Sequence, residues 1–316
     1  MKKYIWKVFP VLILATIVIG ACAPKSTPTP EPTPTIIPPT LTPIPLVPAG
    51  DSKHTVMVGD LERSYLLHIP PNLEVSTSAP AVFMFHGAQS YVTDFLPFGF
   101  KELSDEKGFI IVRPNGTTHH SDFPYALSWN AGTCCNDPVE DNIDESAFIR
   151  EILSDLESIV SVDPKRIYAH GYSNGGMLAY RLACEMSETF AAIAPYAGAL
   201  IYSPCQPQQP VSILHIHGLV DRVVPFEGGS RLAGMLEGFP LGMDGIETWA
   251  QFNGCTETSQ IETGNDDISH TAYTACDAAS SIELILIQDQ GHDYPGLAVI
   301  SMSEIIWNFF EAHPKQ

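Results

Sequence analysis

The chain has 316 residues, and 45% of them are hydrophobic, so it can bury a sizeable core in one large domain or two small ones. Its formal net charge of -20 argues against nucleic acid or anionic lipid as a partner, because the phosphate groups of both would repel it. The same acidity is compatible with an exported protein.

Residues 1–21 have the parts of an export signal. Residues 1–7 are basic, residues 8–20 are apolar but too short for a membrane span, and Ile19-Gly-Ala-Cys22 resembles a bacterial lipobox. By that resemblance, cleavage before Cys22 would leave this residue to carry a lipid. An ordinary secretory signal with an incidental cysteine is the alternative. We expect an extracellular protein that is anchored to the cell membrane through this lipid only.

A stalk is predicted over residues 22–50. Apart from Cys22, this segment is dominated by Pro, Thr and Ser, as in Thr27-Pro-Thr-Pro-Glu-Pro-Thr-Pro34. Proline cannot donate to helix or sheet ladders, and such runs favour extended polyproline II. We expect a semi-rigid spacer between the membrane and a domain that starts at Asp51. A leader with no spacing role is the alternative.

Residues 51–316 have the pattern of a domain in which strands and helices alternate. Short apolar runs predict buried strands, and amphipathic runs predict helices. The predicted strands cover 54–58, 63–69, 79–87, 109–113, 166–170, 190–196, 212–217 and 282–287, and the predicted helices cover 95–107, 141–160, 177–185, a segment ending at 252, and 297–312. This alternation predicts an α/β fold with a mostly parallel central sheet and helices on both faces. Sites in such sheets form at the carboxyl ends of the strands.

The stretch Gly171-Tyr-Ser-Asn-Gly175 matches the G-x-S-x-G pattern of a nucleophile elbow. An apolar run precedes it and a run of helical composition follows it, which is the strand–turn–helix context that the pattern requires. So tight a turn strains the serine backbone and needs small neighbours, and Gly171, Gly175 and Gly176 meet this need. We predict that Ser173 is a nucleophile. A chance serine in a glycine-rich turn is the alternative.

A serine nucleophile needs a base and an orienting acid, which follow the serine in the order acid, then histidine, when the sheet is of this type. Asp221 comes directly after the strand at 212–217, and His292 comes after the strand at 282–287. We predict that His292 takes the proton of Ser173 and that Asp221 fixes the imidazole and stabilises its cation.

Other acids and histidines compete for these roles. Glu227 lies further from a strand end than Asp221, and Asp289 and Asp293 are too close in sequence to His292 to come from a separate loop. Four other histidines lie in or beside strands and are expected to be buried and hydrogen-bonded: His86, His170, His215 and His217. The chain has no H-E-x-x-H or C-x-x-C spacing, so we predict neither a metal nor a cofactor.

The oxyanion of an acyl-transfer reaction needs two backbone donors. We predict the amide of Asn174, directly after the nucleophile, and the amide of Ala88, in the loop after the strand at 79–87, with Gln89 as the alternative. Aromatic residues around this region, namely Trp129, Tyr172 and Tyr294, are predicted to form the walls of an open substrate cleft.

Several motifs together resemble those of the poly(3-hydroxybutyrate) depolymerase and feruloyl esterase group of α/β-hydrolases, over about residues 56–310. They are Trp129–Cys135, Tyr172–Cys184, Ala191–Gly198, His217–Asp221, Val224–Gly229 and Gly291–Gly296. The resemblance implies the α/β-hydrolase fold and secreted hydrolysis of carboxylic esters without metal or cofactor. Two positions depart from the group: Tyr294 stands where many relatives have Trp, and Ala88 where Cys or Gly is more usual.

The leading interpretation is a tethered serine esterase that acts on feruloyl or aryl esters of plant polysaccharide, or on hydroxybutyrate-type polyesters. We expect a monomer whose only partner, apart from the membrane, is its ester substrate. A serine peptidase of the same fold is one alternative. A carbohydrate-binding surface lipoprotein without catalytic activity is another.

Seven cysteines in an exported protein suggest disulfides. Cys255 and Cys276 flank a polar excursion before the last strand, and we predict that they pair. Cys134 and Cys135 are adjacent, and we expect each to bond elsewhere because a bridge between neighbours is strained. The sequence leaves their partners open, along with those of Cys184 and Cys205.

Overall fold

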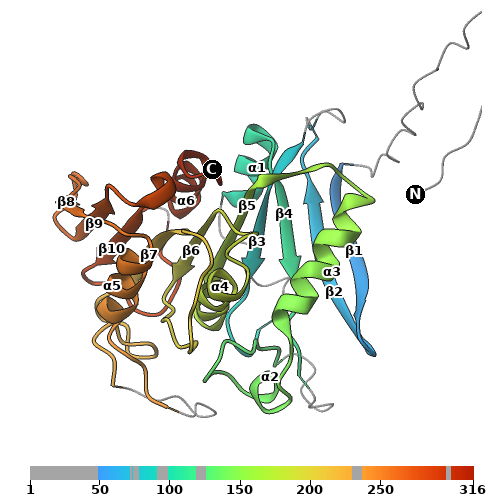
Figure 1. Cartoon of the computed structure of the whole chain (residues 1–316), viewed down its shortest axis with the longest axis horizontal. Helices are drawn as coiled ribbons and strands as arrows, with labels where there is room; N and C mark the ends of the chain where they lie inside the picture. Colours follow the sequence, from blue (N-terminus) through green and yellow to red (C-terminus); the bar gives the residue numbers. More distant parts are fainter. Residues whose placement is uncertain are drawn as a thin grey trace, which may run out of the picture. The chain divides into compact units, whose positions relative to one another are not determined.

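The computed structural model describes residues 49–71, 73, 78–90, 99–118, 126–229, 237–296 and 300–316. The predicted signal, the predicted lipidation site at Cys22 and nearly all of the predicted stalk lie outside these ranges. Within them, ten strands form one sheet in the order β1-β2-β4-β3-β5-β6-β7-β10-β9-β8 (Figure 1). None of the described helices is long and apolar enough to cross a membrane.

The centre of the sheet is parallel and its two edges are antiparallel, as the sequence predicted for a mostly parallel sheet. The first edge is the hairpin of β1 (Gly50–Val58) and β2 (Leu61–Ile69), and β2 pairs with β4. The parallel strands are β4 (Ile110–Pro114), β3 (Ala79–Phe85), β5 (Val162–Tyr172), β6 (Ala192–Tyr196), β7 (Ser212–Gly218) and β10 (Ile282–Ile287). Every residue of β3, β4, β6 and β7 is buried, which agrees with their mostly apolar sequences.

Helices cover both faces of this sheet, as predicted. On one face lie α3 (Glu145–Glu157), α4 (Asn174–Glu185) and α5 (Gly242–Phe252), which pack with the strands into the larger hydrophobic core (Figure 1). On the other face α1 (Phe100–Lys107) and α6 (Met302–Ala312) form a second core. The short α2 (Asp137–Glu140) precedes α3, which therefore begins later than predicted.

Two of the strands were not predicted from the sequence. β8 (Glu257–Gln260) and β9 (Ile268–Thr274) form an antiparallel hairpin at the second edge, and β9 pairs antiparallel with β10. All four residues of β8 are exposed, so the apolar alternation that marks a half-buried strand is absent there. The polar segment that the sequence analysis placed between Cys255 and Cys276 forms this hairpin.

Three disulfides link the six described cysteines. Cys255 pairs with Cys276 across the base of the β8–β9 hairpin, as predicted, and Cys184 pairs with Cys205. The expectation for the adjacent pair was wrong, because Cys134 bonds Cys135. Both are buried in a tight turn in which the Cys135 amide donates to the carbonyl of Trp129, so the turn brings the neighbouring sulfurs together.

Candidate active site

Ser173 occupies a strained turn between β5 and α4. Its backbone has φ 54° and ψ -120°, a conformation that residues with side chains rarely adopt. The turn is held from both sides, since the Ser173 amide donates to the Tyr196 carbonyl at 2.9 Å and the Ser173 carbonyl accepts from the Met177 amide at 3.0 Å. The strain expected for a nucleophile elbow is present at this serine.

Two glycines make the turn possible. A Cβ added to Gly171 would collide with the Gly175 carbonyl, and a Cβ on Gly175 would collide with the carbonyls of Phe85 and His86 at the end of β3. Helix α4 can therefore start close against β3 and β5 only because both positions lack a side chain. This close approach brings the beginning of α4 next to the loop that follows β3.

His292 joins Ser173 to Asp221. The Ser173 hydroxyl donates to His292 Nε2 at 2.9 Å, and His292 Nδ1 donates to Asp221 Oδ2 at 2.7 Å. Asp221 is 4% exposed and Ser173 8% exposed, whereas the His292 ring is accessible from outside. The structure thus brings together the three side chains that the sequence predicted, in the arrangement of a nucleophile, a base and an acid.

Backbone and side-chain donors hold the Asp221 carboxylate. Its Oδ1 accepts from the amides of Val223 at 2.8 Å and Val224 at 2.9 Å, while Oδ2 faces His292 and lies 3.5 Å from His217 Nε2. Burial opposes ionisation of this group. The hydrogen bonds from His217, His292 and Val224 outweigh burial and hold the pKa of Asp221 well below its usual value. Asp221 is therefore ionised, as the orienting role predicted for it requires.

The loops that carry Asp221 and His292 are bonded to each other. The Leu219 amide donates to the Ile287 carbonyl at 2.9 Å, and the Val220 amide donates to the Gln290 carbonyl at 3.1 Å. Both loops follow neighbouring parallel strands, β7 and β10, so their side chains emerge at the same edge of the sheet. Glu227, the competing acid of the sequence analysis, is exposed.

Two backbone amides near Ser173 are available to a ligand. Within the part of the chain that the structure describes, the amides of Ala88 and Asn174 donate no hydrogen bond to the protein. The Gln89 amide, by contrast, is directed to the Ser128 hydroxyl at 3.4 Å. This difference favours Ala88 over Gln89 as the second donor to an oxyanion.

The prediction that Trp129 lines an open substrate cleft was wrong. Its side chain is fully buried, with its ring edge-on to Phe85 and tilted against His86 at centroid distances of 5.5 and 4.9 Å. The indole N–H donates to the His86 carbonyl at 2.9 Å. Sequence alone could not distinguish an aromatic residue that packs under a site from one that faces the substrate.

The two predicted tyrosines lie around His292. The Tyr172 ring is partly buried, 5.2 Å from the His292 ring, and therefore remains a candidate for substrate contact. The Tyr294 hydroxyl lies 3.0 Å from Nε2 of the buried His170, and its ring meets Tyr172 and Tyr196 edge-on. These contacts secure the His292 loop to the sheet, a packing role that the sequence analysis did not assign to Tyr294.

A buried chain of polar groups behind Asp221 was also missed. Tyr180 donates from its hydroxyl to His215 Nδ1 at 2.9 Å, His215 Nε2 lies 3.0 Å from His217 Nδ1, and His217 Nε2 donates to the Val224 carbonyl at 2.7 Å. The spacing of the two histidines gave a signal, because residues two apart on a strand point to the same face. Both are buried, as the sequence predicted.

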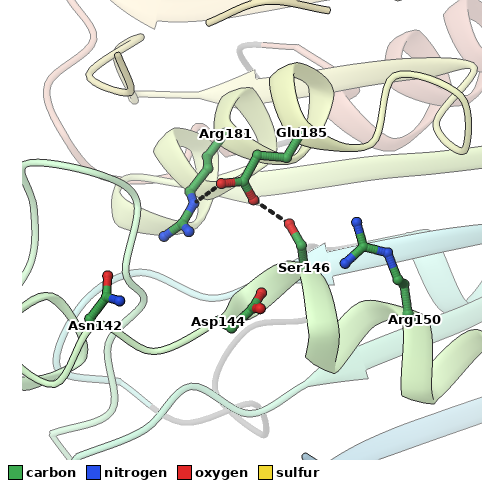
Figure 2. Close-up of a pocket in the computed structure, with 6 residues that line it drawn as sticks. All are labelled: Asn142, Asp144, Ser146, Arg150, Arg181 and Glu185. Carbon is green, nitrogen blue, oxygen red and sulfur yellow. Dashed lines mark hydrogen bonds and ion pairs between the residues drawn. The ribbon is translucent and has the colours of Figure 1, made fainter. Parts of the chain in front are cut away.

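A separate polar pocket of about 380 Å³ lies between α3 and α4 (Figure 2). In it, Arg181 pairs with Glu185 at 3.0 Å, and Glu185 also accepts from the Ser146 hydroxyl. No group of three or more potential metal ligands occurs among the described residues. The residues that line the pocket do not include Ser173, Asp221 or His292, so the pocket is distinct from the candidate catalytic set.

A mostly parallel sheet with a strained serine, a histidine and a buried aspartate at the carboxyl ends of its strands defines an α/β-hydrolase. Comparison with known proteins agrees with this class. The sequence model of the phospholipase/carboxylesterase family matches residues 76–243. The chain therefore belongs to this family, in the feruloyl esterase group of α/β-hydrolases, and is placed among carboxylic ester hydrolases.

Individual relatives carry related names. Feruloyl esterase B of Piromyces equi is 34% identical over 243 residues, which are 73% of this chain but only 42% of that protein. Feruloyl esterase C of Emericella nidulans is 29% identical over 79% of this chain and 84% of its own length. Among solved structures, the acetyl xylan esterase from Aspergillus awamori has a TM-score of 0.57 at 17% identity, over 83% of this chain and 99% of that one. At that identity the likeness shows the fold.

Proposed function

We propose that this chain is a serine esterase that hydrolyses feruloyl and related aryl esters of plant polysaccharide. The observation that carries the proposal is the continuous set of hydrogen bonds from Ser173 through His292 to Asp221 on a strained elbow. The names of the relatives support the substrate class, since several are feruloyl esterases. Hydroxybutyrate-type polyesters remain the second substrate class to test.

The mechanism follows from the positions of these groups. Ser173 Oγ attacks the ester carbonyl carbon as its proton passes to His292 Nε2, and Asp221 stabilises the imidazolium. The carbonyl oxygen becomes an anion that accepts from the amides of Ala88 and Asn174. Collapse of this intermediate expels the alcohol, which takes the proton from His292. A water molecule, deprotonated by the same ring, then attacks the acyl carbon, and His292 returns the proton to Ser173 Oγ as the carboxylic acid leaves.

A panel of substrates tests the proposed specificity. We expect kcat/KM to be higher for methyl ferulate than for a 3-hydroxybutyrate trimer, p-nitrophenyl acetate and p-nitrophenyl palmitate. A preference for the trimer would favour the polyester, and a preference for palmitate would contradict an aryl or short-chain site. Feruloyl amide is the matched control for peptidase chemistry, and turnover of it at a rate close to that of the ester would contradict an esterase.

We also propose export and lipid anchoring at Cys22. The lipobox-like sequence at 19–22 supports this, and so do the disulfides, which form in oxidising compartments. Replacing Cys22 with Ser should remove the lipid and release the protein from membrane fractions. An unmodified N-terminus away from Cys22, found by mass spectrometry of the wild-type protein, would contradict the anchor.

A further inference from the structure

Trp129 is bonded to both segments that carry the amides assigned to the oxyanion. On one side it makes two hydrogen bonds with Asn174: its amide donates to Asn174 Oδ1 at 2.8 Å, and Asn174 Nδ2 donates to its carbonyl at 3.1 Å. Asn174 is 1% exposed, so no water competes for these groups. The residue directly after the nucleophile is therefore held by its side chain as well as by its place in α4.

The indole of Trp129 reaches the other segment. Its N–H donates to the His86 carbonyl at 2.9 Å, two residues before Ala88. His86 is fixed in turn, because its Nε2 accepts from the Gly116 amide at 3.0 Å. A single residue thus connects the two segments, since its main chain bonds the Asn174 side chain at the start of α4 and its indole bonds the loop after β3.

The main chain of Asn130, next to Trp129, is bonded to side chains of α3 and α4. The Asn130 amide donates to the buried Glu145 carboxylate at 3.1 Å, and the Asn130 carbonyl accepts from Arg181 Nη1 at 2.7 Å. Arg181 is itself oriented by Glu185, as Figure 2 shows. Helices α3 and α4 therefore hold the main chain next to Trp129 through Glu145 and Arg181.

Two other tryptophans show that this bonding is particular to Trp129. Trp249 and Trp307 are also buried, yet in the described part of the protein their indole N–H groups have no hydrogen-bond partner. Burial of an indole in this fold therefore does not require a bond to a carbonyl. The bond of Trp129, by contrast, reaches the loop that carries the Ala88 amide.

We propose that Trp129 is a positioning residue that sets the distance between the amides of Ala88 and Asn174. The inference rests on the proposed function of these amides as donors to the oxyanion. Fixed donors stabilise charge that develops only in the transition state, so a small displacement lowers kcat more than it weakens substrate binding. Displacements on the scale of an ångström can reduce rates by about 100-fold.

Trp129→Phe tests this role because it keeps the buried ring and removes the N–H. We expect kcat for methyl ferulate to fall about tenfold or more while KM changes less than about twofold. Affinity for an arylboronic acid, which forms a tetrahedral adduct with the serine, should fall by the same factor as kcat. Trp249→Phe and Trp307→Phe are the matched controls and should keep wild-type kcat and boronate affinity.

A second variant guards against misfolding. Asn174→Ala keeps the backbone amide but removes the other half of the connection, so it should lower kcat and boronate affinity in the same way. The double variant should lose little beyond the worse single variant, because both break one connection. Thermal unfolding shows whether each variant is folded. If Trp129→Phe does not fold, Asn174→Ala alone is compared with the wild-type protein.

The outcomes separate this inference from the proposed function. If Ser173→Ala is inactive but folded Trp129→Phe and Asn174→Ala keep wild-type kcat and boronate affinity, the positioning role is wrong and the esterase mechanism stands. Equal losses in Trp129→Phe and Trp249→Phe would also overturn the role, because they would reflect a general effect on the core. Retained turnover in Ser173→Ala would instead contradict the mechanism itself.

Discussion

His215 Nε2 lies 3.0 Å from His217 Nδ1, and both rings are buried. The pair sits between the Tyr180 hydroxyl, which donates to His215, and the Val224 carbonyl, which accepts from His217. When both rings are neutral, each ring accepts at Nδ1 and donates at Nε2, and His217 Nε2 also lies 3.5 Å from Asp221 Oδ2. Burial, together with the neighbouring ring, holds the pKa of His215 well below its usual value.

The first prediction is a loss of stability in acid. Burial, partly opposed by the hydrogen bond to Ala194, lowers the pKa of His170 from 6.5 to about 4, and His215 is shifted in the same direction. Below pH 6.5 the unfolded chain binds protons that the folded protein does not accept. The free energy of unfolding should therefore fall between about pH 6.5 and pH 4, by about 3 kcal/mol for His170 alone.

Urea unfolding at a series of pH values measures this loss. Well above pH 6.5 the rings of His170 and His215 are neutral in the folded and the unfolded state, so these histidines should add no slope there. His215→Gln should reduce the slope on the acid side. A free energy of unfolding that stays constant down to pH 4 would contradict the assignment of these histidines as buried and neutral.

The second prediction separates Asp221 from the acid that competed with it in the sequence. Asp221→Asn should lower kcat for methyl ferulate by about 10³- to 10⁴-fold, because an amide cannot stabilise the imidazolium and favours the wrong tautomer of His292. Glu227→Gln is the matched control and should keep wild-type kcat, since Glu227 is exposed and outside the triad. Comparable losses in the two variants would exclude Asp221 as the specific acid.

The third prediction concerns the disulfide at the base of the β8–β9 hairpin. Replacing Cys255 and Cys276 together with Ser should lower the free energy of unfolding by about 3 kcal/mol, because the bridge restricts the unfolded chain. The Cys184–Cys205 bridge spans the same sequence separation of 21 and should cost a similar amount when removed. Urea unfolding checks both, and an unchanged midpoint without Cys255 and Cys276 would contradict the prediction.

The meeting of Ser173, Asp221 and His292 could be predicted from the sequence because its signals are local. Ser173 has glycines at fixed offsets, and Asp221 and His292 each follow a continuous apolar strand in the required order. The parallel sheet then brings three distant loops to one edge, so the order of the motifs was enough to predict which side chains meet. The hydrogen bonds between Ser173, His292 and Asp221 agree with that prediction.

Features that depend on packing could not be read in this way. The burial of Trp129 is decided by Phe85, His86 and Asn174, which are distant in the sequence. Similarly, the exposed β8 forms because β9 offers it an edge, and no apolar pattern in β8 reports this. The bond between Cys134 and Cys135 depends on the turn that contains them, whereas the sequence supplied only a general expectation of strain.

The central claim is that Ser173 is a nucleophile activated by His292, and covalent labelling tests it most directly. The folded protein is treated with a fluorophosphonate, and peptide mass spectrometry locates the adduct. We predict a single adduct on the peptide that contains Ser173, absent in Ser173→Ala and strongly slowed in His292→Ala. Labelling of a different residue in the wild-type protein, or equally fast labelling of His292→Ala, would contradict the account.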